Sequence, residues 1–291
     1  MDASIHNRAM LAKLSVSLWT ARRYDKKASQ EVSQQHGTKD DVGRYNKHLL
    51  GGKDASAKHQ AVVSVASAAR VAHYENTLPW ADEGWRILPT ANWTEYAEKI
   101  RKAKVEFDNA ARAFVDDYPN LKAQAKSLLN GLYREEDYPT PEKVATLFAC
   151  DVDYTPIPMR GDLRVALPQA EVEKIEADVE ARVQRATADA MKDAWRRLQE
   201  VVSKVRERLA DPEAIFRDSL IGNVSDCVDV LRRLNLTDDP DLEAARAKVE
   251  LELADLSPKD LRENKGYREI IAKKAETILA TMSSIYGAQS A

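Results

Sequence analysis

Residues 169–210 carry the longest uninterrupted helical pattern in the sequence. Its apolar positions recur at steps of three and four residues, which average about 3.7, close to the period of a straight α-helix rather than the strict 3.5 of a coiled coil. These positions are Val172, Ile175, Val179, Val183, Ala186, Ala190, Ala194, Leu198, Val201, Val205 and Leu209. At 1.5 Å per residue such a helix is about 60 Å long, and we predict that it is the spine of the protein.

The composition favours a helical fold around this spine. The chain has 291 residues, of which 44% are apolar, enough to build a core. Charged residues make up 31%, whereas only 10 glycines, 11 prolines and 4 phenylalanines occur, a balance typical of long solvent-exposed helices rather than a β-sandwich or barrel. We expect a mainly α, α-rich α+β fold: a long-helix bundle with a small β-hairpin or three-stranded sheet.

Further helices are predicted on both sides of the spine. We expect one over residues 55–76, another over 92–130 that breaks or restarts at Pro119, and a short one after the N-cap Thr140. The last three begin at a capping residue followed by proline, at Asp211, Asp239 and Ser257, and run to Leu234, Leu256 and toward Tyr286. This order suggests an N-terminal helical region 1–131, a short helix with a hairpin over 132–168, and the spine with a helical tail over 169–291.

Two segments have the period-2 alternation of β-strands. Phe148, Cys150, Val152 and Tyr154 alternate with Asp151 and Asp153, and Leu163, Val165 and Leu167 repeat the pattern after a turn, which predicts a β-hairpin. A lone hairpin is marginal in water, so a third strand is expected. The candidate is Leu14–Leu18, which also fits a helix with Leu11 and Ala21; we favour a strand.

The sequence contains no recognisable catalytic or metal-binding constellation. Cys150 and Cys227 lie far apart in differently patterned segments, which gives no support for a disulfide framework or a thiolate metal site. Gly51-Gly52-Lys53 lacks the remainder of a phosphate-loop motif, and His73-Tyr74-Glu75 lacks the cysteine half of a zinc deaminase signature. No segment has the length of apolar sequence that a membrane-spanning helix needs, so we expect a cytoplasmic protein. From the lack of catalytic and metal-binding motifs we expect a non-enzymatic protein without a cofactor.

The N-terminal part is basic and contains interleaved aromatic residues. Residues 1–60 hold eleven lysines and arginines against six acidic residues. Alternating aromatic and cationic side chains are what single-strand nucleic-acid grooves use, aromatics to stack bases and cations to hold phosphates. The candidate contacts are Trp19, Arg22, Arg23, Tyr24, Lys26, Lys27, Arg44, Tyr45 and Lys47. The alternative is a helix that anchors its aromatics in the core and exposes its cations to water.

The spine helix itself has a widened apolar stripe. Met191 and Trp195 lie beside the alanines of the stripe, close to Leu198. Because a short partner helix would not cover that much apolar surface, we predict that these three residues form an interface between copies of the chain.

The segments LSVSLWTARRYDKK, HYENTLPW and DPEAIFRDSL resemble a family of uncharacterised helical proteins of bacteria and phages. Members are similar to proteins encoded beside MoxR-type AAA+ ATPases, so the resemblance implies an adaptor for an AAA+ ATPase, in the host cytoplasm if the chain is phage-encoded. The family provides no catalytic residues to carry over. We therefore predict a phage-type structural or interaction protein that works by self-assembly or as an adaptor, or alternatively a single-stranded nucleic-acid-binding protein of phage replication or recombination.

Overall fold

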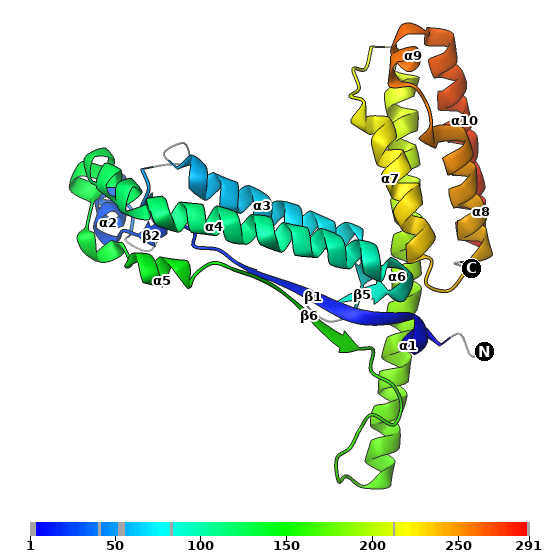
Figure 1. Ribbon diagram of the computed structural model, residues 1–291, viewed down its shortest axis with the longest axis horizontal. Helices are drawn as coiled ribbons and strands as arrows, with labels where there is room; N and C mark the ends of the chain where they lie inside the picture. The colour runs from blue at the N-terminus through cyan, green and yellow to red at the C-terminus, as the bar shows by residue number, and fades with distance from the viewer. Residues whose placement is uncertain (1–3, 40–41, 52–55, 82–83, 212, 290–291) are drawn as a thin grey trace. The chain divides into compact units, whose positions relative to one another are not determined.

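The computed structural model describes residues 4–39, 42–51, 56–81, 84–211 and 213–289 (Figure 1). Helices account for 67% of the chain and strands for 11%, which confirms the predicted α-rich fold with a small antiparallel sheet. The chain forms two compact units. Unit 1 contains Met1–Lys13, His73–Ala97 and Asp153–Ala291, and unit 2 contains Leu14–Ala72 and Glu98–Val152.

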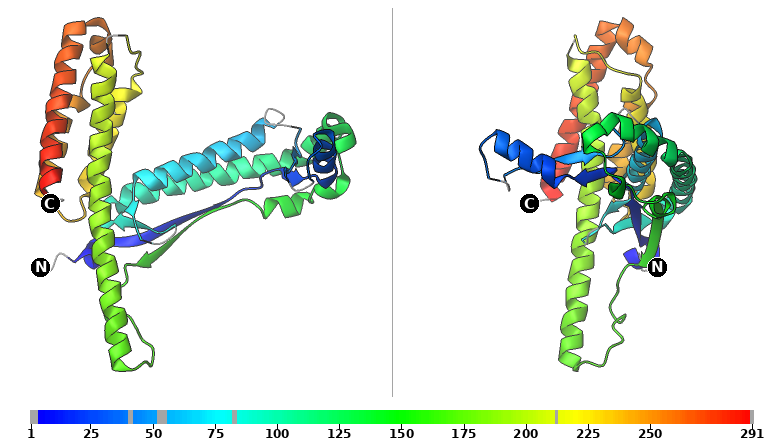
Figure 2. Two further views of the ribbon diagram at one scale, coloured as in Figure 1. Left: turned by 180° about the vertical axis from the view of Figure 1, so that it is seen from behind. Right: turned by 90° about the vertical axis from the view of Figure 1, so that its left-hand side faces the viewer.

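Unit 1 is built on the spine helix, α6, which spans Gln169–Ala210 as predicted. Its other helical segments are α1 Ile5–Arg8, α7 Ser219–Leu234, α8 Pro240–Val249, a π-helical stretch Glu250–Ala254, α9 Pro258–Glu263 and α10 Lys265–Gln289. Helices α7 and α10 lie along the C-terminal half of α6 (Figure 2). The apolar stripe of α6 therefore becomes the centre of one core, with Val224 and Leu231 of α7 and Ile271 and Ile278 of α10 packed against it.

The predicted oligomer residues lie inside this core. Met191, Trp195 and Leu198 expose 9%, 4% and 0% of their surface, and the Trp195 indole Nε1 donates to Asp239 Oδ2 at 3.0 Å. The premise that these side chains form an exposed apolar surface is wrong, because the helices that follow α6 in the chain cover them. Self-association remains a prediction, but Trp195 and Leu198 offer no free surface for it, and Met191 exposes only 9% of its own.

The helical tail differs from the sequence prediction at two of its starts. Helix α7 begins at Ser219 rather than after Asp211, and Pro212 lies outside the described residues. The predicted last helix is divided at Asn264, whose backbone is extended and whose side-chain oxygen accepts the Tyr267 N–H at 2.9 Å, so that it caps α10. Asp239 and Ser257 cap α8 and α9 as expected.

A four-stranded sheet has the order β4, β5, β1, β6. The strands are β1 Ala9–Ser17, β4 Leu78–Pro79, β5 Arg86–Pro89 and β6 Ala149–Pro156, and β1 pairs antiparallel with β5 from Ala9↔Pro89 to Ala12↔Arg86. The strand assignment of the Leu14 segment and its position beside β6 are confirmed. The predicted hairpin is wrong: residues 163–167 form no strand, and β6 is the edge strand of the sheet with β1 as its neighbour.

Unit 2 contains a second core, between α3 Ala57–Glu75 and α4 Trp93–Leu129, which lie side by side (Figure 1). The remaining elements of this region are β2 Arg22–Tyr24, α2 Lys26–Gln35, β3 Asn46–His48, two 3-10 turns at Asn130–Leu132 and Glu135–Asp137, and α5 Pro141–Ala145, the last capped by Thr140 as predicted. Helix α4 continues through Pro119, so the predicted break is wrong. An internal proline costs about 3 kcal/mol, and the buried Phe114, Tyr118 and Leu121 on both sides of it offset that loss.

A buried arginine closes the C-terminal end of α6. Arg268 of α10 exposes only 8% of its surface, and its guanidinium donates to the carbonyls of Arg208 at 2.8 Å, Leu209 at 3.2 Å, Ala214 at 3.0 Å, and also Asp211. The last carbonyls of a helix have no partner within the helix, so this one side chain satisfies groups that would otherwise be buried without a donor.

We predict that Arg268→Met lowers the free energy of unfolding by about 1–3 kcal/mol, since it leaves these carbonyls without a donor. Urea denaturation followed by circular dichroism measures the change. Lys273→Met, at an exposed position of the same helix, is the matched control and is expected to stay within about 0.5 kcal/mol of the parent. Equal effects of the two substitutions would contradict the capping role.

Candidate nucleic-acid interface

Strands β2 and β3 form a small antiparallel sheet in unit 2 that brings the two basic aromatic segments together. Arg22 lies opposite His48, Arg23 opposite Lys47, and Tyr24 opposite Asn46. Side chains that are directly opposite share a face, and successive residues alternate between faces. Arg23 and Lys47 therefore lie on one face of the ribbon, and Arg22 and Tyr24 on the other.

A buried ion cluster lies under the first of these faces. Lys47 exposes 2% of its surface; its Nζ is 2.9 Å from Asp25 Oδ2 and 2.7 Å from Asp137 Oδ2, and it donates to the Leu132 carbonyl at 2.8 Å. We call Lys47, Asp25 and Asp137 the Lys47 cluster. Asp25 is also the N-cap of α2, because its Oδ1 accepts the Ala28 N–H at 3.1 Å. The cluster thus joins β3, the start of α2 and the segment before α5.

The electrostatics of the cluster favour the charged forms. The hydrogen bond from the Ala28 N–H lowers the pKa of Asp25, and the Lys47 ammonium lowers it further. Burial by itself lowers the pKa of Lys47, but hydrogen bonds to Asp137 and Asp25 more than offset it, so the pKa is raised overall. The pair consequently stays ionised across neutral pH.

The opposite face of the ribbon is open to solvent and basic. Tyr24 exposes 45% of its surface, and the Arg44 guanidinium lies 5.7 Å from the centre of its ring; Tyr45, which follows Arg44 directly before β3, exposes 41%. Within the described part of the chain, neither Arg22 nor Arg44 forms a salt bridge with a carboxylate. Together with Lys26 and Lys27 we call these residues the basic face: Arg22, Tyr24, Lys26, Lys27, Arg44 and Tyr45.

The first turn of α2 adds two cations at a position that helix electrostatics disfavours. Lys26 and Lys27 are exposed, and this turn contains no acidic residue. The partial positive charge of a helix N-terminus repels each cation, at a cost of about 0.3–1 kcal/mol. Among the residues that the structure describes, Lys27 forms an exposed ion pair with Glu31 at 3.8 Å and Lys26 forms none. The two lysines therefore do not stabilise the helix at this position. Their charges would, however, attract an anionic ligand.

Three of the predicted contact residues do not belong to the basic face. Trp19 is half-buried, with its ring 5.4 Å from Tyr118 and its carbonyl 2.8 Å from His59 Nε2; Lys47 is in the cluster; and Arg23 turns toward Asp137 at 3.6 Å. Ala21 separates Trp19 from Arg22 and has a left-handed backbone with φ of 51°, held by the Leu49 N–H to its carbonyl at 2.8 Å. This turn directs Trp19 inward and Arg22 outward.

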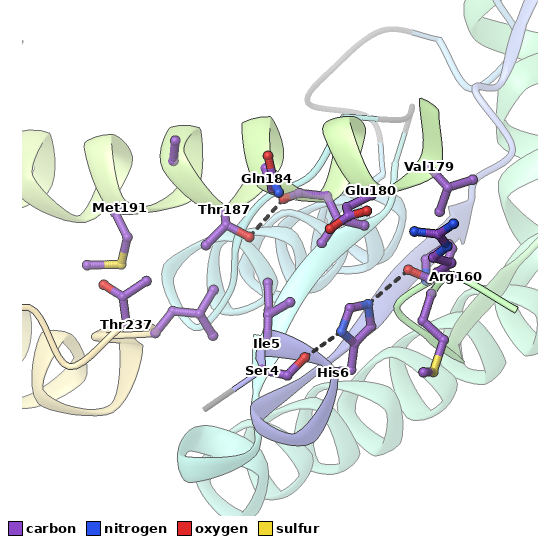
Figure 3. Close-up of a pocket in the computed structure, with 15 residues that line it drawn as sticks. Ser4, Ile5, His6, Arg160, Val179, Glu180, Gln184, Thr187, Met191 and Thr237 are labelled. Atoms are coloured by element: carbon purple, nitrogen blue, oxygen red, sulfur yellow. Dashed lines mark hydrogen bonds between the residues drawn. The ribbon is translucent and has the colours of Figure 1, made fainter. Parts of the chain in front are cut away.

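A groove in unit 1 was not indicated by the sequence. It has a volume of about 690 Å³ and is lined by four separate segments, residues 4–6, 158–160, 179–191 of α6, and 236–237 (Figure 3). His6 fixes one wall, because its Nε2 donates to the Pro158 carbonyl at 3.0 Å and its Nδ1 is 2.6 Å from Ser4 Oγ (Figure 3). No short motif could have revealed it, since the lining residues meet only in the folded chain.

The other titratable groups of interest are held within the fold. His73 hydrogen-bonds the Tyr96 hydroxyl at 2.8 Å, and burial, with a smaller effect of Arg86, lowers its pKa to about 4. Burial raises the pKa of the Cys150 thiol, and that of Cys227 to about 11, so both stay protonated at neutral pH. Across the residues with described positions, no three His, Cys, Asp or Glu side chains are grouped as metal ligands, and no helix has the length and apolarity to cross a membrane.

Comparison with known proteins gives no assignment: no protein-family model, curated protein or solved structure matches the chain.

We predict that Asp25→Asn lowers the free energy of unfolding by about 3 kcal/mol near neutral pH, because it breaks a buried ion pair. Asp25 has a lowered pKa, so its contribution is present above the ordinary aspartate pKa and is lost as the pH falls through the folded-state value. The difference between parent and variant should therefore shrink below pH 4 in urea titrations. Asp116→Asn, at an exposed position, is the control; a pH-independent difference would contradict the ion-pair account.

Proposed function

We propose that the chain is a non-catalytic binding protein that holds single-stranded nucleic acid on the basic face. The observation that carries the proposal is that exposed tyrosines and arginines without carboxylate partners are gathered on β2 and directly before β3, where Arg44 lies against the ring of Tyr24. A flexible strand can place phosphates at the cations and stack bases on the rings of Tyr24 and Tyr45. Each base–aromatic contact is worth on the order of 1–3 kcal/mol and is independent of base identity.

The charge distribution around the face supports an anionic ligand. Residues 20–48 contain seven lysines and arginines. The two carboxylates of the Lys47 cluster pair with the buried Lys47 and with Arg23, and not with the cations of the basic face. Four cations, Arg22, Lys26, Lys27 and Arg44, remain for phosphates. At about 0.7 counterions per phosphate on a single strand they release at most about three, so we expect modest affinity with a shallow salt dependence.

A protein-binding role is a second proposal, favoured by the groove in unit 1. Self-assembly and an adaptor role toward an AAA+ ATPase, which the family resemblance implies, belong here. Because the helices packed on α6 bury its apolar stripe, Trp195 and Leu198 are not available for such a contact, and Met191, which is 9% exposed, contributes only where it lines the groove.

We predict opposite effects of Lys26→Glu on binding and on stability. Affinity for a labelled 20-nucleotide single strand at low salt should fall about 5- to 10-fold, since a phosphate contact becomes repulsive. The free energy of unfolding should rise by up to about 1 kcal/mol, because an acidic residue suits the N-terminus of α2. Fluorescence anisotropy and urea denaturation measure the two. Lys102→Glu, an exposed charge reversal on α4, is the control, and equal loss of affinity in both variants would refute a localised site.

We predict that Tyr24→Leu and Tyr45→Leu each weaken binding about tenfold, while Tyr24→Phe and Tyr45→Phe keep the parent affinity, because stacking needs the ring and not the hydroxyl. The salt dependence should stay unchanged, since no cation is removed. Anisotropy titrations at several salt concentrations provide both readouts. If the leucine and phenylalanine variants bind alike, the rings do not stack bases.

A further inference from the structure

We infer that the groove in unit 1 binds a basic amphipathic helix of a partner protein. The groove is elongated: the α6 residues that line it run from Val179 to Met191, twelve steps of 1.5 Å, or about 18 Å. Three turns of a partner helix have this length. A shallow trough along a helix suits the helix-in-groove mode of recognition, in which apolar side chains at steps of three and four enter an apolar floor.

The floor of the groove is apolar, and the polar groups of its walls are mostly engaged. Val183 and Met191 are buried at its base, with Val179 and Leu236 beside them. The position of Met191 here is consistent with its adaptable side chain, which suits a surface that receives another apolar side chain. Ser4, His6, Arg160 and Thr187 of the walls form hydrogen bonds within the chain, and the apolar floor favours the apolar face of a ligand.

The walls contain one cation, and that cation is neutralised within the chain. Arg160 pairs with Glu176 at 3.1 Å, and the Gly161 N–H donates to the same carboxylate at 3.0 Å (Figure 3 shows Arg160). Glu180 also lines the groove, and in the described part of the chain it has no salt-bridge partner.

The segment of α6 that leads into the groove is rich in acidic residues, of which Glu180 lines the groove and Glu176 is paired with Arg160. Residues 171–180 contain five acidic residues, Glu171, Glu173, Glu176, Asp178 and Glu180, against the single lysine Lys174. A partner helix with lysines or arginines beside its apolar stripe complements this field, and complementarity of this kind fixes both the identity and the orientation of a partner. A second copy would bring its own acidic α6 segment to this one, and the repulsion of like charges disfavours it.

The test uses two fluorescently labelled synthetic peptides with leucines at the same helical spacing. One has lysines and the other has glutamates at the remaining positions. We expect the lysine peptide to bind the full chain in anisotropy titrations and to weaken as salt is raised, and the glutamate peptide not to bind. Binding of neither peptide, or of both equally, would overturn the inference.

Variants locate the binding. Thr187→Arg places a bulky cation within the groove and should reduce affinity for the lysine peptide at least tenfold; Glu180→Lys should reduce it about fivefold. Glu207→Lys makes the same charge change at an exposed position far along α6 and should leave it unchanged. Equal affinity of the parent and Thr187→Arg would place the peptide elsewhere and overturn the inference. The inference would also be overturned if the parent protein sedimented as a dimer and Thr187→Arg converted it to a monomer, because the groove would then hold a second copy of the chain.

The outcome is separable from the nucleic-acid proposal. Thr187 and Glu180 lie in unit 1, whereas the basic face belongs to unit 2. Thr187→Arg should therefore bind the single-stranded oligonucleotide as tightly as the parent while losing the peptide, and Lys26→Glu should show the reverse. Loss of both ligands in Thr187→Arg would mean that the substitution damages the fold, and Glu180→Lys, at an exposed position, then decides the inference by its fivefold loss or its absence.

Discussion

The buried ammonium group of Lys47 requires negatively charged partners in direct contact with it. The arrangement of the basic face depends on those partners. Removal of a single charge from water costs several kcal/mol unless close partners offset it. Asp25 and Asp137 provide the opposite charges, and the Leu132 carbonyl provides a further acceptor. Because Asp25 also caps α2, the same carboxylate fixes where that helix begins and thereby where Lys26 and Lys27 stand. A chain without this cluster would lose the register between α2 and β3 together with the charge.

Two arginines, the half-buried Arg197 and the buried Arg268, perform a comparable task in unit 1. The guanidinium of Arg197 donates to the carbonyls of Tyr74, Glu75 and Thr77 at the C-terminal end of α3, while its Nε pairs with Asp193. Arg268 does the same for the end of α6. A fixed fork of donors matches the several unpaired carbonyls at a helix terminus, which a lysine could not satisfy with the same geometry. Helix ends far apart in the sequence are thus joined by single side chains.

Prediction from the sequence was most successful where a regular repeat of apolar residues extends over many residues. The apolar repeat of α6 predicted all 42 residues of that helix. The capping residues Asp239 and Ser257, each followed by proline, predicted where α8 and α9 begin. The prediction of a second hairpin strand at 163–167 was wrong. Alternation of apolar and polar residues shows that a segment can form a strand but does not show which strand it would pair with. The break predicted at Pro119 does not occur, because burial of the neighbouring side chains outweighs the cost of a proline inside the helix.

The candidate sites show the same limits. Spacing alone identified the basic aromatic segments, but only the fold separates Arg22 and Tyr24, which face solvent, from Trp19 and Lys47, which face inward. The left-handed Ala21 that divides them carries no sequence signal, since glycine or asparagine would be the ordinary choice there. The covering of Trp195 by later helices and the groove between four distant segments depend on tertiary contacts that a periodic pattern does not contain.

Photocrosslinking tests most directly whether the basic face binds single-stranded nucleic acid, as we propose. A single-stranded oligonucleotide containing 5-bromouracil is irradiated in complex with the full-length protein, and the crosslinked peptides are identified by mass spectrometry. Because crosslinks form preferentially at aromatic rings stacked on the base, we predict adducts at Tyr24 and Tyr45. Adducts confined to Trp80, Trp85 or Trp93, or a pattern that does not change when excess unlabelled strand competes, would contradict the assignment of the basic face as the binding surface.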